Sequence, residues 1–113
     1  MVSEATDLEI VATGGVRSGL DVAKAMALGA TAAGVAHPLL RAAVEGTKDD
    51  VISELLKIIE GLKTAMYLTG CQTVEDLSTI PIILSAELIA TLNSLGLDYA
   101  RFTRAWRRSM MFP

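Results

Sequence analysis

The chain has 113 residues, an apolar fraction of 51% and a formal net charge of −3. This size fits one domain, and an acidic balance argues against a general nucleic-acid-binding protein. The single cysteine, Cys71, excludes a disulfide framework and a cysteine-rich metal site, so we expect an inert thiol and a cytoplasmic protein.

No segment has the character of a membrane span or a signal peptide. The longest uncharged run, residues 25–40, is interrupted by glycine and proline and is shorter than the roughly 20 apolar residues that a spanning helix needs. The first residues are acidic, and no apolar stretch of useful length follows them. The high apolar content therefore indicates either a helical domain with a large buried fraction or a portion of a larger structure whose apolar faces require a partner.

The first part of the chain alternates strand and helix. Residues 8–13 (LEIVAT) predict a buried parallel strand that ends in glycines, and residues 20–28 predict a helix with Gly29 just past its end. Residues 31–36 (TAAGVA) predict a second short strand, and Pro38 starts a helical turn that stops at Gly46. This order is typical of a parallel α/β fold.

The next segment predicts one long helix. Thr47 and Asp50 have the spacing of a capping box, and Gly70 marks the end of the helix. Apolar residues recur at helical spacing, which predicts a single buried face. These residues are Val51, Leu55, Ile58, Ile59, Leu62 and Met66.

The remaining residues predict further helices. Thr73 and Asp76 repeat the cap spacing before a short helix at residues 74–77. Residues 80–84 (IPIIL) are expected to be extended, and Ser85 caps a helix that ends at Gly96. Asp98 is expected to cap a last helix with four arginines, which form a solvated face or an oligomer contact: Arg101, Arg104, Arg107 and Arg108.

The chain is thus expected to be α/β over residues 1–46 and helical over residues 47–113, as two parts of one domain. Parallel sheets need cover on both faces, so a two-stranded parallel sheet requires strands from elsewhere.

Two glycine-containing loops follow the predicted strands. In ATGGVRSG (residues 12–19), Gly14 and Gly15 allow a nest of backbone N–H groups, the following helix adds its positive end, and Arg17 adds a charged donor. GVAHP (residues 34–38) stands at the corresponding place after the second strand. Loops after the last two strands are a frequent phosphate site in (β/α)8 barrels.

Each of these features also has an ordinary structural explanation. A Gly-Gly pair alone is more often just a turn, and Arg17 alone is more often a surface residue. His37 is the only histidine and has no evident acid–base partner, so taken alone it is not expected to be catalytic.

The combined pattern resembles a known family. The stretch IVATGGVRSGLDVAKAMALGATAAGVAHPLL is similar to the strand 7 to strand 8 segment of FMN-dependent (β/α)8 barrels. Two branches share the pattern, the 2-hydroxy-acid oxidases and the type 2 isopentenyl-diphosphate isomerases. Residues 62–77 are similar to both, whereas residues 80–98 resemble the isomerases, and Ser18 suits their archaeal members. The resemblance runs from about residue 8 onward and corresponds to about the last third of the family's length.

The resemblance implies a fold and a cofactor site. The fold is the C-terminal portion of a (β/α)8 TIM barrel, with strands 7 and 8 and their helices in residues 1–46 and the C-terminal helical segment in residues 47–113. The matched FMN-phosphate residues, which act mainly through backbone N–H groups, are Gly14, Gly15, Val16, Arg17, Ala36 and His37. Many FMN barrels carry Gly-Arg where this chain has Ala36-His37, so a side-chain contact at that place does not follow from the resemblance.

The resemblance also implies an activity. Isomerases of this type interconvert isopentenyl and dimethylallyl diphosphate in isoprenoid biosynthesis, with reduced FMN, NADPH as reductant and Mg²⁺ assisting diphosphate binding. The family's catalytic and metal-binding residues lie on earlier strands, so none is expected in this chain, which should be inactive alone. Expected partners are the remainder of the barrel, an isoprenoid diphosphate and further copies in a homo-oligomer, with no nucleic acid and no membrane. The alternatives are a portion of a 2-hydroxy-acid oxidase or dehydrogenase and a non-catalytic half-barrel that self-associates.

Overall fold

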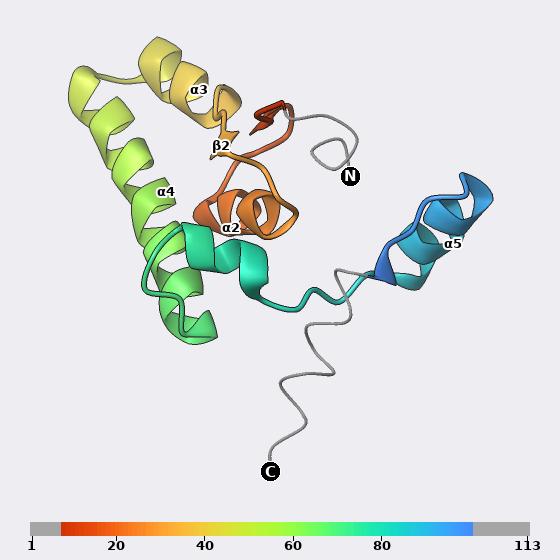
Figure 1. Ribbon diagram of the computed structural model, residues 1–113. Helices are drawn as coiled ribbons and strands as arrows, with labels where there is room; N and C mark the ends of the chain where they lie inside the picture. The colour runs from red at the N-terminus through yellow and green to blue at the C-terminus, as the bar shows by residue number, and fades with distance from the viewer. Residues whose placement is uncertain (1–7, 101–113) are drawn as a thin grey trace. The chain divides into compact units, whose positions relative to one another are not determined.

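The computed structural model describes residues 8–100, and these form an α/β arrangement (Figure 1). The elements in chain order are β1 (Val11–Ala12), α2 (Gly19–Ala27), β2 (Ala32–Ala33), α3 (His37–Glu45), α4 (Lys48–Thr69), the 3₁₀ helix η1 (Glu75–Thr79) and α5 (Ala86–Ser94). The chain divides into two compact units, one up to Ser78 and one from Thr79 onward. The predicted arginine-bearing helix lies outside the described residues.

The two strands form a parallel pair in which Val11 lies opposite Ala32 and Ala12 opposite Ala33. Both strands are shorter than the sequence predicted, because each has only one neighbour among the described residues and a strand continues only as far as its partner does. The prediction of a buried first strand was wrong for the same reason: the Val11 side chain is 60% exposed.

Local capping signals account for the helix boundaries. Ser18 and Asp21 form a capping box at the start of α2, and Thr47 and Asp50 form one at the start of α4. Gly70 closes α4 in a left-handed conformation. The predicted positions of α2 and α4 are therefore confirmed to within one residue at each end.

The helices α2 and α3 both pack against α4 (Figure 1). The α2–α4 crossing is closest at Gly19 and Gly61, where a Cβ atom on Gly19 would collide with the backbone of Ile58 and Leu62. The small core consists of Val22, Ala23 and Ala27 from α2, Ile58 from α4 and Leu77 from η1.

The prediction of a single buried face on α4 was partly wrong. Ile58 is buried, but Leu55 is 45% exposed and Ile59 is 39% exposed. The close glycine crossing puts the centre of the contact near Ile58 and Gly61. Leu55 and Ile59 lie on the neighbouring face, where they have little cover from the described residues.

The end of the first unit and the second unit are less regular. The short helix predicted after Thr73 is a 3₁₀ helix, η1, and Asp76 accepts the Thr73 N–H at 2.8 Å. Residues 81–85 form neither helix nor strand, as expected around Pro81. In the second unit, Ser85 caps α5 by accepting the N–H of Leu88 at 3.2 Å. The predicted organisation into residues 1–46 and 47–113 concerns barrel units and stays a prediction.

Candidate functional site

The candidate site lies where the two parallel strands end. Because β1 and β2 run in the same direction, the loops that follow them leave from the same edge of the pair. The two loops approach closely: a Cβ atom on Gly34 would lie 3.0 Å from the Thr13 side-chain oxygen. The structure therefore brings the two glycine-containing segments together, as their spacing predicted.

The first loop exposes backbone donors. Gly14 and Gly15 have φ angles of +81° and +89°, which side-chain-bearing residues rarely adopt. The N–H groups of Gly14, Gly15 and Val16 have no hydrogen-bond partner among residues 8–100. Apart from each glycine's own chain neighbours, no heavy atom of the described residues lies within 4 Å of the position that a Cβ atom would take on either glycine. Three successive donors beside open space form the kind of nest that binds an anion.

The start of α2 is already capped from within the chain. The N–H groups of Arg17 and Ser18 each donate to Asp21 Oδ2 at 3.2 Å, and the Asp21 N–H donates to the Ser18 hydroxyl at 3.2 Å. Hydrogen bonding from the Arg17 backbone, followed by that from the Ser18 side chain, lowers the pKa of the Asp21 carboxyl. Arg17 can therefore offer a bound anion its side chain, whereas its backbone donor serves Asp21.

The second loop leads into an open helix end. Ala36 occupies the N-cap position of α3 and provides no side-chain acceptor, and Pro38 within the first turn has no N–H. His37 is the first residue of α3, and its side chain is exposed. Unlike α2 and α4, α3 thus begins without an internal anion or hydroxyl at its positive end.

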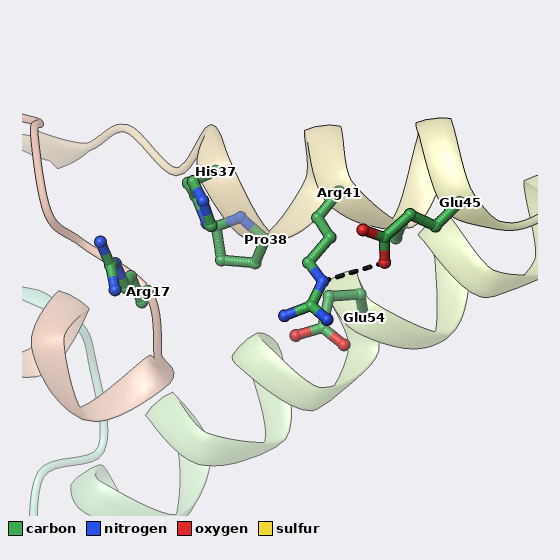
Figure 2. A pocket seen from close by; sticks show the side chains of 7 residues that line it. Arg17, His37, Pro38, Arg41, Glu45 and Glu54 are labelled. Atoms are coloured by element: carbon green, nitrogen blue, oxygen red, sulfur yellow. Dashed lines mark hydrogen bonds and ion pairs between the residues drawn. The ribbon is translucent and has the colours of Figure 1, made fainter.

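The six predicted phosphate residues do not share one pocket. Arg17 and His37 line a hollow of about 400 Å³, and Figure 2 shows Arg17 on the loop after β1 and His37 at the start of α3. Gly14, Gly15 and Val16 line a second hollow of about 360 Å³. Val16 and Arg17 are neighbours in sequence but line different hollows, and Ala36 lines neither.

Both hollows contain charged residues besides the six predicted phosphate residues. Lys24 lines the glycine hollow together with Asp21, while Arg41, Glu45 and Glu54 line the Arg17–His37 hollow. Arg41 Nε and Glu45 Oε2 form an ion pair at 3.0 Å (Figure 2). Arg41 and Glu45 follow the motif stretch on α3, and only the packing of α3 on α4 reveals that Glu54 lines the same hollow.

Other kinds of site find less support in the described part of the chain. Within residues 8–100, no group of three or more His, Cys, Asp or Glu side chains is placed to hold a metal ion. Among the same residues, no helix combines the length and the apolar character needed to cross a membrane. Cys71 is partly buried, and its sulfur accepts from the Thr69 hydroxyl at 3.3 Å.

Comparison with known proteins shows the family of this chain. The profile of the FMN-dependent dehydrogenase family matches residues 1–96. The chain belongs to this family. Membership in the FMN-dependent dehydrogenase family implies a fold of the TIM-barrel type, which agrees with the parallel β–α–β unit described above.

The chain is also similar to curated archaeal proteins that bear the name isopentenyl-diphosphate delta-isomerase. It is 49% identical to that of Thermococcus kodakarensis over 84 residues, which cover 74% of this chain and 22% of the relative. It is 43% identical to that of Sulfurisphaera tokodaii over 106 residues, covering 94% of this chain and 28% of the relative. It is 40% identical to that of Methanothermobacter thermautotrophicus over 107 residues, which cover 91% of this chain and 29% of the relative. The chain thus spans about a quarter of the length of these relatives.

Proposed function

We propose that this chain is the portion of an FMN-dependent TIM barrel that carries strands 7 and 8, and that it binds the phosphate of FMN. The first loop would contribute the backbone N–H groups of Gly14, Gly15 and Val16 and the Arg17 side chain. The second would contribute the open start of α3 at Ala36 and His37. The observation that carries this proposal is the nest of three N–H groups, unpartnered among residues 8–100, beside the uncapped helix α3 at the same edge of a parallel strand pair.

The chemistry of these groups suits a phosphate monoester. A phosphate presents oxygens that accept several hydrogen bonds at once, and three consecutive N–H groups can donate to them without any side chain in the way. The Asp21 carboxylate already satisfies the start of α2, so the loop and α3 supply the remaining donors. The glycine hollow is also lined by Lys24, a further positive charge, and by the Asp21 carboxylate, which already accepts the N–H groups of Arg17 and Ser18.

We further propose that the whole protein interconverts isopentenyl and dimethylallyl diphosphate, as the names of its relatives suggest. Bound FMN would supply the reactive group, while the residues in this chain hold its phosphate and so fix the position of the flavin. NADPH would reduce the flavin, and Mg²⁺ would assist binding of the substrate diphosphate. The described residues offer no metal cluster, so the magnesium ligands would come from other residues.

The partners follow from the same proposal. The unpaired outer edges of β1 and β2 would join further strands of the barrel. Alone, the chain would turn over no substrate and would self-associate through its exposed apolar side chains, and sedimentation would then show species larger than a monomer. The whole enzyme would be a cytoplasmic homo-oligomer that binds neither nucleic acid nor membranes.

One alternative has a specific observation in its favour. The family is described as FMN-dependent dehydrogenases, so the barrel could instead oxidise a 2-hydroxy acid. The curated isomerases match up to 94% of this chain, which favours the isomerase.

A chimera distinguishes these activities. Residues 8–100 would replace the matching segment of the Thermococcus kodakarensis protein, and the product would be assayed with isopentenyl diphosphate and, separately, with 2-hydroxy acids. We expect isomerase activity that depends on FMN. Oxidation of a 2-hydroxy acid without isomerisation would refute the isomerase assignment.

A separate experiment tests the phosphate site. Titrating the 113-residue chain with FMN should shift the amide resonances of Gly14, Gly15 and Val16, and riboflavin, which lacks the phosphate, should not. The matched control residues are Gly70 and Gly96, which also have positive φ angles (+74° and +67°) but lie outside both loops. Equal shifts at the control glycines, or none at the loop, would remove the proposed site.

A further inference from the structure

The glycine hollow, which residues 14–16 line, extends well beyond the loop after β1. Its lining also includes Ile10 just before β1 and Leu28 just after the end of α2. Because α2 leads from the end of β1 back to the start of the parallel strand β2, it runs opposite to β1. The hollow therefore follows the strand and the helix along their length, a shape that suits a polypeptide segment better than a small molecule.

Away from the glycine loop, the lining of this hollow is mostly apolar. Ile10 and Ala12 line it from the strand side, and Ala25 and Leu28 line it from the helix side. Leu28 is 47% exposed, although its side chain is large and apolar. A connected apolar surface that the surrounding residues leave open indicates an interaction site. The described residues thus leave α2 without cover on the side of the hollow.

The strand beside the hollow also has an open edge. β1 pairs with β2, and it has no other strand partner among residues 8–100. A further parallel strand at the open edge must reach β1 through a crossover, which is usually a helix. Such crossovers are right-handed, and the step into β1 would run in the same direction as the step from β1 to β2. Its helix would therefore lie on the face of the sheet that α2 covers, beside α2 and over the hollow.

We infer that the glycine hollow is the docking site of the strand–helix unit that precedes β1 in the whole protein. The inference rests on the proposed function, in which this chain supplies two strands of a barrel. The chain spans only 22–29% of its curated relatives, so most of their length can supply such a unit. One unit satisfies both the open edge and the open hollow, and for this reason we favour it over a second copy. Its helix would place apolar side chains against Ala25 and Leu28 and a carboxylate near Lys24, which has no ion-pair partner within residues 8–100.

The test compares thiol labelling at position 28 in the 113-residue chain and in the chimera with the Thermococcus kodakarensis protein. Both carry Leu28→Cys together with Cys71→Ser, and mass spectrometry of peptides locates the labelled site. Position 28 should react at least about tenfold more slowly in the chimera, because a covered thiol reacts only through local opening. Ala25→Cys, in the same hollow, should behave alike. The control Ser53→Cys, at an exposed position of α4 outside the hollow, should react at similar rates in both proteins.

Equal labelling rates at positions 25 and 28 in the two proteins would overturn the inference, because the hollow would then be open in the longer protein. Protection that is already present in the 113-residue chain and is lost on dilution would assign the hollow to a second copy, and it would overturn the inference as well. Failure of the proposed function looks different. A chimera that protects both positions but does not isomerise isopentenyl diphosphate would support the docking site and count against the activity, and an active chimera with both positions exposed would do the reverse.

Discussion

The close crossing of α2 and α4 predicts an asymmetry between two glycine substitutions. In Gly19→Ala, the new methyl group would collide with the Ile58 carbonyl oxygen and the Leu62 nitrogen, and it would lie 2.5 Å from the Gly61 carbonyl carbon. All three atoms are backbone atoms of α4, so no side chain can rotate away. The helices must separate, or the start of α2 must unwind.

The expected loss of stability in Gly19→Ala is the cost of overpacking minus the gain in helix propensity. Overpacking of this kind costs typically about 1–3 kcal/mol and occasionally more, and a rigid backbone neighbour puts Gly19→Ala at the upper end. Replacing a helical glycine by alanine returns at most about 1 kcal/mol. We expect a net loss of about 2 kcal/mol in the free energy of unfolding, and weaker FMN binding because the loop before α2 moves with the helix.

Gly61→Ala is the matched control at the same crossing. Its methyl group would lie 3.3 Å from Gly19 Cα and from Gly19 N, which requires a shift of only a few tenths of an ångström. Gly61 lies inside α4, so the gain in helix propensity of about 1 kcal/mol offsets this crowding. Urea denaturation followed by circular dichroism should give a clearly lower midpoint for Gly19→Ala and a midpoint close to the wild type for Gly61→Ala. Equal midpoints for the two variants would refute the close crossing.

Four further outcomes follow from single contacts. Gly15→Ala, at a φ of +89°, should lose about 1–2 kcal/mol of stability and weaken FMN binding, as calorimetry would measure. Thr47→Ala removes the α4 cap and should cost about 1 kcal/mol in urea denaturation, and Thr47→Ser should restore it. Leu77→Ala empties a fully buried position (0% exposed) and should cost about 2–5 kcal/mol, so a change below about 1 kcal/mol would contradict the packing. The pKa of the Asp21 carboxyl is lowered by the Arg17 and Ser18 hydrogen bonds, so its contribution to stability is present above the ordinary carboxyl range and is lost as the pH falls through the folded-state value. Asp21→Asn should therefore flatten the acid limb of a stability–pH curve, and an unchanged limb would argue against the cap.

Features that depend on residues close together in sequence could be predicted. The helix caps lie where the sequence predicted them, because a cap involves residues only three or four positions apart. They are Thr47 with Asp50 and Gly70 at the two ends of α4, and Ser85 at the start of α5. The parallel pairing of the two strands could also be predicted, since two strands joined by a single crossover helix usually lie parallel in one sheet.

Features that depend on distant residues could not be predicted. The exposure of Leu55 and Ile59 follows from where α2 crosses α4, and that crossing is set by Gly19 and Gly61, which are 42 positions apart and form no local motif. The lengths of the strands depend on neighbours that the chain meets only in three dimensions. In the candidate site, the sequence identified the two loops, but the placement of Arg17 and His37 in one hollow and of the glycines in another required the structure.

The role of Asp21 explains how this site can distinguish between two helix starts that are chemically alike. Each helix presents a positive end to the edge where the strands stop, and either end could attract a phosphate. At α2, the Asp21 carboxylate accepts the N–H groups of Arg17 and Ser18, so an external anion there would meet a negative charge. At α3, Ala36 provides no such group. Under the proposed function, a phosphate would therefore be directed toward the glycine loop and the start of α3.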